Sequence, residues 1–355
     1  MHQPILTRLS FVVALWAGAA PAFAASPAPV EGQNGMVVTA QHLASQVGVD
    51  VLKAGGNAVD AAVAVGYALA VVYPTAGNLG GGGFMTIRMA DGTTTFLDFR
   101  ERAPLAATKD MYLGPDGNPI PGASTETYLA VGTPGSVAGF EMAREKYGTR
   151  PREELLAPAI RLASEGFVLE QGDIASLAEG NERLAQDPAA ARIFLKEGKP
   201  YAMGDRLVQG EANAIAPRKS PLSSMSPTIL SKDGKPFMVI GSPGGSRIIT
   251  ITLQAIMNVV DHGMDLQEAI DAPRIHHQWL PDRVFMEPRA LSPDTLRLLT
   301  GMGYNVGIDP DWTIWGEAAG ILVGGKNLAQ IEDGDGTGYY GAIDSRASAG
   351  AAIGY

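Results

Sequence analysis

One stretch decides the fold: PLSSMSPTILSKDGKPFMVIGSPGGSR, residues 221–247. The apolar run 237–240 predicts a strand, and an apolar-periodic run from Ile248 to about Val260 predicts a helix. The turn between them, residues 241–245, holds three glycines. A tight glycine turn between a strand and a helix leaves backbone N–H groups unpaired, so it can bind an anion or stabilise a developing oxyanion. The alternative for Gly244 and Gly245 is a plain strand-to-helix turn.

Three polar residues elsewhere suit a carboxylate ligand. Ser223 and Ser224 place adjacent hydroxyls in a proline-punctuated loop, and Arg100 follows the predicted strand 93–99. A guanidinium binds a carboxylate in bidentate geometry. The alternatives are ordinary loop capping for the two serines and an ion pair with Glu101 or Asp98 for Arg100.

The remaining elements predict an α+β chain, because strands and helices come in groups and do not alternate strictly. The glycine run 77–83 follows a predicted helix and opens a strand, which is the reverse of a dinucleotide-binding fingerprint. Residues 103–126 look like a loop, and residues 186–220 show no clear period. Further predicted helices cover residues 42–53, 58–72, 135–147, 152–164, 170–185, 265–272 and 292–302, and further strands cover residues 84–89 and the start of the tail 339–355.

Composition excludes several classes of function. The net charge of −10 argues against nucleic acid or an anionic membrane surface as a partner. The chain has no cysteine, which excludes disulfides, thiolate zinc sites and a cysteine nucleophile. His276 and His277 are adjacent on an extended segment and point to opposite sides, so they make a poor metal site. We expect neither a metal nor a cofactor.

The N-terminus has the pattern of a secretory signal peptide over residues 1–24. Arg8 supplies the positive charge, residues 9–20 the apolar segment, and Ala22-Phe23-Ala24 the cleavage signal. An uncleaved anchor is the alternative, although the apolar run is short of the ~18 residues that span a bilayer. We therefore expect a periplasmic or secreted protein without stable membrane insertion, with residues 25–35 as a linker.

Motifs along the whole chain resemble the gamma-glutamyltransferases, also called gamma-glutamyltranspeptidases or glutathione hydrolases. Matching segments before residue 210 are GMVVTAQHLASQVGVDVLKAGGNAVDAAVA, NLGGGGFM, FLDFRERAP, GTPGSVAGFEMAREKYGT and LLAPAIRLASEGF. Later segments are GEANAIAPRKSPLSSMSPT, GSPGGSR, APRIHHQWLP and DSRASAGAAIGY. The resemblance divides the chain into a large-subunit-like part, 36–209, and a small-subunit-like part, 210–355, packed as one domain.

The resemblance implies an N-terminal-nucleophile hydrolase fold, a four-layer α/β/β/α sandwich. In that family a precursor cuts itself, and the new N-terminal threonine attacks the gamma-glutamyl amide of compounds such as glutathione. The glutamyl group then passes to water or to an amino acid or peptide. Arg100, Ser223 and Ser224 match the residues that bind the substrate carboxylate, and Gly244 and Gly245 match the oxyanion hole.

The chain departs from the family in one place. The family's self-cleavage site with its T-T-H/S-type start, and its Q-M-D-D-F-type motif, are both missing, since AMGDRLVQ runs directly into GEANAIAP. Leu207-Val208-Gln209 fits either side of the junction, so we expect an internal deletion, an incomplete sandwich and a single uncut chain. The nucleophile is unassigned: Thr93–Thr95, Thr228 and Thr133 lack a processing site, and no G-x-S-x-G elbow occurs. The alternatives are a non-catalytic remnant that binds glutamyl groups and an unfolded product.

Overall fold

The computed structural model describes residues 26–125, 127–207, 223–309, 315–334 and 337–355. The predicted signal peptide and most of the predicted junction lie outside these residues. The helices are α1 (His42–Lys53), α2 (Ala58–Val72), α3 (Ser136–Tyr147), α4 (Arg152–Glu165), α5 (Gln171–Ala178), α6 (Asn181–Gln186), α7 (Pro188–Phe194), α8 (Ile248–Val260), α9 (Leu266–Asp271), α10 (Pro293–Gly301) and α11 (Leu328–Asp333). The strands are β1 (Val30–Gly32), β2 (Met36–Thr39), β3 (Phe84–Arg88), β4 (Thr94–Asp98), β5 (Phe167–Val168), β6 (Arg206–Leu207), β7 (Thr228–Lys232), β8 (Lys235–Gly241), β9 (Ile275–His276), β10 (Val284–Met286), β11 (Val306–Ile308), β12 (Ala319–Val323), β13 (Tyr339–Ile343) and β14 (Ala351–Gly354).

The main sheet has five strands in the order β1-β13-β12-β8-β7, and every neighbouring pair is antiparallel. The strand predicted at residues 237–240 is β8, which pairs on both sides. Its Phe237, Met238 and Ile240 are buried. The glycine turn therefore leaves the sheet from an interior strand whose position is held on two sides.

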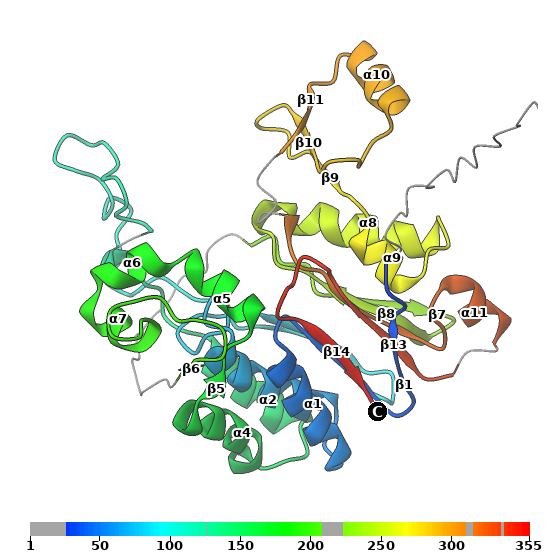
Figure 1. Cartoon of the computed structure of the whole chain (residues 1–355), viewed down its shortest axis with the longest axis horizontal. Helices are drawn as coiled ribbons and strands as arrows, with labels where there is room; N and C mark the ends of the chain where they lie inside the picture. The colour runs from blue at the N-terminus through cyan, green and yellow to red at the C-terminus, as the bar shows by residue number, and fades with distance from the viewer. Residues whose placement is uncertain (1–25, 126, 208–222, 310–314, 335–336) are drawn as a thin grey trace, which may run out of the picture.

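The sheets and helices stack in four layers. Helices α8 and α9 pack on one face of the main sheet, whereas the two-stranded sheet β14-β2 packs on the other face and carries α1 on its far side (Figure 1). The two sheets approach closely, since a Cβ atom added at Gly341 of β13 would collide with the side chain of Met36. The expected α/β/β/α order is present, and within the described residues the second sheet has only two strands.

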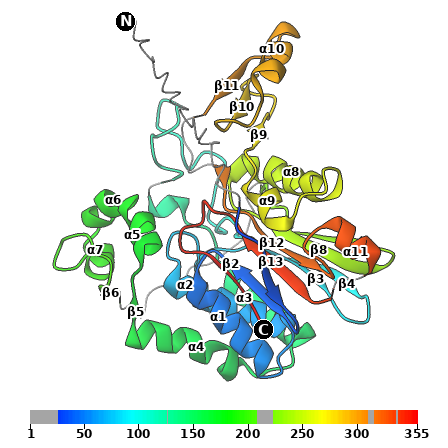
Figure 2. The same ribbon diagram turned by 45° about the vertical axis from the view of Figure 1, so that its right-hand side comes forward.

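Two hydrophobic clusters form the core. One cluster draws on buried residues between Ala44 and Leu207, and the other on buried residues between Phe237 and Ala342. Away from both, β9–β11 and α10 project beyond α8 (Figure 2). The described residues contain no helix long and apolar enough to cross a bilayer.

Most predicted elements are present, and the differences fall on short ones. Residues 30–32, inside the expected linker 25–35, form the edge strand β1 that pairs with β13. The tail holds two strands, because its small-residue end is β14, paired with β2. Residues 170–185 form two helices, and the aperiodic segment after them contains α7 and β6. Strands of two to four residues are too short to show a period.

Candidate active site

The glycine turn has two residues in conformations that favour glycine. Gly244 has φ 134° and Gly245 has φ 56°. The carbonyl of Gly244 accepts the N–H of Arg247, whereas no hydrogen bond from the N–H of Gly244 or Gly245 to another described residue is present. These N–H groups stand just before α8, whose N-terminus favours negative charge. The turn therefore has the free donors that an oxyanion requires.

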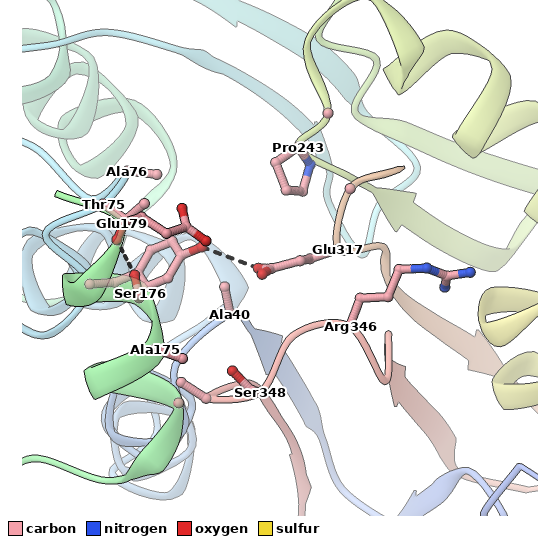
Figure 3. A pocket seen from close by; sticks show the side chains of 15 residues that line it. Ala40, Thr75, Ala76, Ala175, Ser176, Glu179, Pro243, Glu317, Arg346 and Ser348 are labelled. Atoms are coloured by element: carbon pink, nitrogen blue, oxygen red, sulfur yellow. Dashed lines mark hydrogen bonds between the residues drawn. The ribbon is translucent and has the colours of Figure 1, made fainter. Parts of the chain in front are cut away.

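A cavity of about 210 Å³ lies on one side of the turn (Figure 3). Both halves of the chain build its walls. The lining residues are Ala40, Tyr73, Thr75, Ala76, Gly172, Ala175, Ser176, Glu179, Pro243, Gly244, Gly316, Glu317, Arg346, Ser348 and Ala349.

Gly316 sets Glu317 beside the turn. Gly316 has φ 73°, and a Cβ atom there would collide with the carbonyl oxygen of Pro243. Only glycine lets the backbone approach this closely. The neighbouring Glu317 accepts a hydrogen bond from the Tyr73 hydroxyl at 3.1 Å.

The cavity is acidic. Burial raises the pKa of Glu317, although the hydrogen bond from Tyr73 opposes this. Burial and the Glu317 charge raise the pKa of Tyr73, so the phenol stays protonated. Glu179 adds a second carboxylate, and Arg346 supplies no free cation because its guanidinium runs away from the cavity to Asp344 and Glu287 (Figure 3).

A second cavity, of about 410 Å³, lies along the start of α8. Gly244 lines both cavities, so the turn stands between them. Residues 244–247 line one side of the second cavity, and this side is basic because it includes Arg247. Its lining residues are Gly244, Gly245, Ser246, Arg247, His276, Gln278, Pro281 and Phe285.

Arg100 follows β4 and is paired within its own loop. Its Nη1 atom lies 2.7 Å from Glu101 Oε2, and its backbone N–H donates to Asp98 at 3.0 Å. This ion pair is the alternative that the sequence leaves open for Arg100. The Nε–H of Arg100 is buried without a hydrogen-bond partner, so the guanidinium keeps a donor to offer.

The two serines lie in the loop before β7. Ser223 Oγ accepts the N–H of Met225 at 3.2 Å, and the Ser224 carbonyl accepts the hydroxyl of Ser226 at 3.0 Å. The loop capping that the sequence allows is therefore present for the Ser223 hydroxyl, whereas Ser224 takes part through its backbone carbonyl. Among the described residues, no hydrogen bond or ion pair joins Arg100, the serines and the glycine pair.

The histidine pair divides as its spacing predicts. His276 is buried and bonded to Thr250 and Gln278, whereas His277 pairs with Asp282 at 3.1 Å. Across the described ranges no group of three or more acidic or histidine side chains is placed to hold a metal.

One of the threonines that the sequence considers, Thr228, lies opposite Ile240, the residue just before the turn. Neither cavity is lined by Thr93–Thr95, Thr133 or Thr228. The structure instead adds Tyr73, Glu317 and Arg247. Arg247 ends the stretch 221–247, but no sequence pattern assigned it a role. No local sequence signal connects Tyr73 with Glu317.

Comparison with known proteins decides the family. The family model described as gamma-glutamyltranspeptidase matches residues 44–211 and 206–354. The chain belongs to this family. A glutathione hydrolase proenzyme of Pseudomonas sp. (strain A14) is 36% identical, with 94% of this chain and 96% of that protein covered. The structure of Helicobacter pylori gamma-glutamyltranspeptidase is 46% identical over 51% of this chain and 52% of that one, with a TM-score of 0.50.

The same comparisons bear on the junction and on the fold. The alignment with the Pseudomonas relative runs over 557 residues, whereas this chain has 355, so the relative contains chain that is absent here. The two family matches share residues 206–211. A cephalosporin acylase structure from Bacillus halodurans, 16% identical, covers 96% of this chain and 99% of its own with a TM-score of 0.75. That likeness shows a shared fold, and the match to the gamma-glutamyltranspeptidases identifies it as the N-terminal-nucleophile hydrolase fold.

Proposed function

We propose that the chain acts on gamma-glutamyl amides such as glutathione, hydrolysing them and passing the glutamyl group to amino acids or peptides. The observation that carries the proposal is the turn at Gly244 and Gly245, whose unpaired N–H groups stand between two cavities. Relatives named glutathione hydrolase proenzyme support the substrate class.

In the proposed complex the amide carbonyl oxygen accepts the N–H groups of Gly244 and Gly245. Those donors strengthen as the oxygen becomes an oxyanion, which lowers the barrier. Arg100 takes the glutamyl carboxylate, helped by Ser223 and Ser224. Because Glu101 holds Nη1 of Arg100 in the unliganded chain, substrate competes with that partner for the guanidinium.

The nucleophile is unassigned, so we propose that water attacks the bound amide carbon: the C–O bond forms, the C–N bond breaks, and the amine half leaves with a proton from the attacking water. An acceptor amine that attacks in place of water transfers the glutamyl group instead. In serine proteases that lack their catalytic residues, binding and the oxyanion hole alone retain roughly 10³–10⁴-fold catalysis over water. We expect an acceleration of about that order here, from a chain that stays uncut. We further propose that the absent segment falls at Leu207–Gln209, inside the overlap of the two family matches.

We also propose export to the periplasm or the medium, on the basis of residues 1–24. The net charge of −10 supports a small-molecule substrate over nucleic acid.

The test is hydrolysis of a chromogenic gamma-glutamyl anilide by the purified chain, with a denaturing gel of the same sample. We expect slow turnover from one uncut band. Two bands together with turnover would contradict the expectation that the chain stays uncut. No turnover, together with a glutamate-induced rise in melting temperature, would favour the non-catalytic alternative.

The role of Arg100 has its own test. If Glu101 competes with substrate for Arg100, substitutions of the two partners should change KM in opposite directions. Arg100→Gln should raise KM, since it removes the carboxylate partner. Glu101→Gln should lower KM, since it frees the guanidinium. A pair that serves only the loop would leave KM unchanged in both variants.

A further inference from the structure

Arg247 is a buried cation with an incomplete set of partners. Its side chain is only 9% exposed, and its Nη2 donates to Asp309 at 2.6 Å. The guanidinium carbon lies 4.3 Å from the Trp315 ring centroid and 5.2 Å from that of Phe285. Nη1 is buried and has no hydrogen-bond partner. Buried donors are normally satisfied, so an unpaired one calls for a ligand or a cost in stability.

The cavity that Arg247 lines is suited to a small anionic molecule. Its volume of about 410 Å³ lies within the range of small-molecule sites. The polar groups of His276 and Gln278 on its wall are already used, since they bond each other and Thr250 and Leu280. Arg247 is therefore the cation that the described wall of this cavity offers to a ligand.

The charges of the two cavities differ in a way that matches the two halves of a gamma-glutamyl peptide. The glutamyl half carries an ammonium group, which the acidic cavity around Glu317 favours, and a carboxylate, which we assign to Arg100 outside the lining of that cavity. The amine half of an intact amide such as glutathione has lost its ammonium to the amide bond and keeps only its carboxylate. Gly244, where the proposed oxyanion forms, lines both cavities.

From this arrangement we infer that the cavity of Gly245, Arg247, His276 and Phe285 binds the carboxylate of the amine half, through Arg247. One guanidinium can serve two carboxylates, because its donors point along different edges. Asp309 holds Nη2 and the two rings fix the plane, so Nη1 is left for the ligand; because Nη1 is closed to solvent in the unliganded chain, the carboxylate has to open that edge when it binds. The inference rests on the proposed function for the identity of the ligand.

The test uses N-acetyl-glycylglycine and its C-terminal amide, which differ only in the carboxylate. Ligand binding raises the melting temperature in proportion to occupancy. We expect the free acid, at millimolar concentration, to raise the melting temperature of the unsubstituted chain and the amide to leave it unchanged. An equal shift with both compounds, or no shift with the acid, would overturn the inference.

Variants locate the effect. Arg247→Met should weaken binding of the acid at least tenfold. The matched control is Arg283→Met, because Arg283 lies 5.3 Å from the same Phe285 ring but does not line the cavity; it should bind the acid as before. If Arg247→Met does not fold, Arg247→Lys keeps the charge but lacks the second nitrogen, and it should also bind at least tenfold more weakly. Unchanged affinity in either variant would contradict the assignment.

The probe contains no glutamyl group and the measurement needs no turnover, so the two proposals fail separately. Turnover of the anilide without binding of the acid would contradict the Arg247 site and leave the proposed hydrolysis standing. Binding of the acid without turnover would retain that site and count against the hydrolase.

Discussion

At the scale of single residues, the proposed site requires a close approach of the chain to the glycine turn, residues 241–245. Gly316 and Glu317 come from the segment before β12, far along the sequence, and they touch the turn because residue 316 has no side chain. Sequence patterns could identify the turn itself, since a strand, three glycines and a helix follow one another. They could not identify Tyr73 and Glu317, whose hydrogen bond depends on the packing of two halves.

Gly316→Ala tests this close approach. The new methyl group would meet the Pro243 carbonyl, and alanine is strained at φ 73°. We expect a loss of roughly 1–3 kcal/mol in the free energy of unfolding, and slower anilide hydrolysis because the turn shifts. Denaturant unfolding measures the first effect. Gly241→Ala is the control, since its Cβ would meet nothing within 4 Å; equal losses in both variants would contradict the account.

Glu317→Gln tests the burial of the carboxylate. Because burial raises the pKa of Glu317 in the folded chain, the folded state holds its proton more tightly than the unfolded state. Stability is therefore retained below the ordinary glutamate pKa of about 4.3 and is lost as the pH rises through the folded value. Glutamine carries no charge and can still accept from Tyr73.

The expected result is a higher melting temperature for Glu317→Gln than for the unsubstituted chain at pH 7. The difference should close as the pH falls toward 4. Calorimetry across this range provides the measurement, with the exposed Glu182→Gln as control. A lower melting temperature at pH 7 would show that Glu317 stabilises the fold as an anion.

At the scale of elements, long periodic helices were predictable and short elements were not. The predicted limits of α1, α2 and α8 agree with the structure, because α1 and α8 carry a sustained apolar period and α2 is apolar nearly all round. Helices α1 and α2 also have a clear cap. Strands β1, β6 and β14 have two to four residues, and only their partners across a sheet define them. The boundary between α5 and α6 was also not predicted, because no proline marks it in the sequence.

Helix α2 shows how one buried carboxylate can hold several elements. Asp60 is fully buried, and it accepts the N–H groups of Asn57, Thr149 and Arg150 and the hydroxyl of Thr149. Burial alone would raise the pKa of Asp60, but these hydrogen bonds outweigh it and lower the pKa. Its stabilisation is therefore present above the ordinary aspartate pKa and is lost as the pH falls through the folded value.

Asp60→Asn should lower the free energy of unfolding by about 1–3 kcal/mol at pH 7. The amide replaces one acceptor oxygen by a donor that faces other donors. Thermal unfolding measures the loss, and Asp91→Asn, at an exposed turn where Asp91 accepts from Thr93, should cost less. An unchanged melting temperature for Asp60→Asn would contradict this role.

At the scale of the whole molecule, the chain keeps the four layers of its family while it has far fewer residues than the relatives with which it aligns. Family membership could be predicted from the sequence, because the matching motifs run along the chain. The residues of the site could be predicted only in part. Arg100, Ser223 and Ser224 were named from the resemblance, yet in the described residues the side chains of Arg100 and Ser223 use local partners, and Ser224 accepts a hydrogen bond through its backbone carbonyl. Their convergence on one substrate remains a prediction.

The most direct measurement is the initial rate of anilide hydrolysis by the purified chain, with its intact mass determined from the same sample. We expect release on the order of 10³-fold above the uncatalysed rate, from a single uncut species, and a slower rate at low substrate for Arg100→Gln. Release no faster than in buffer alone would contradict the claim that the turn and its two cavities form a working gamma-glutamyl site.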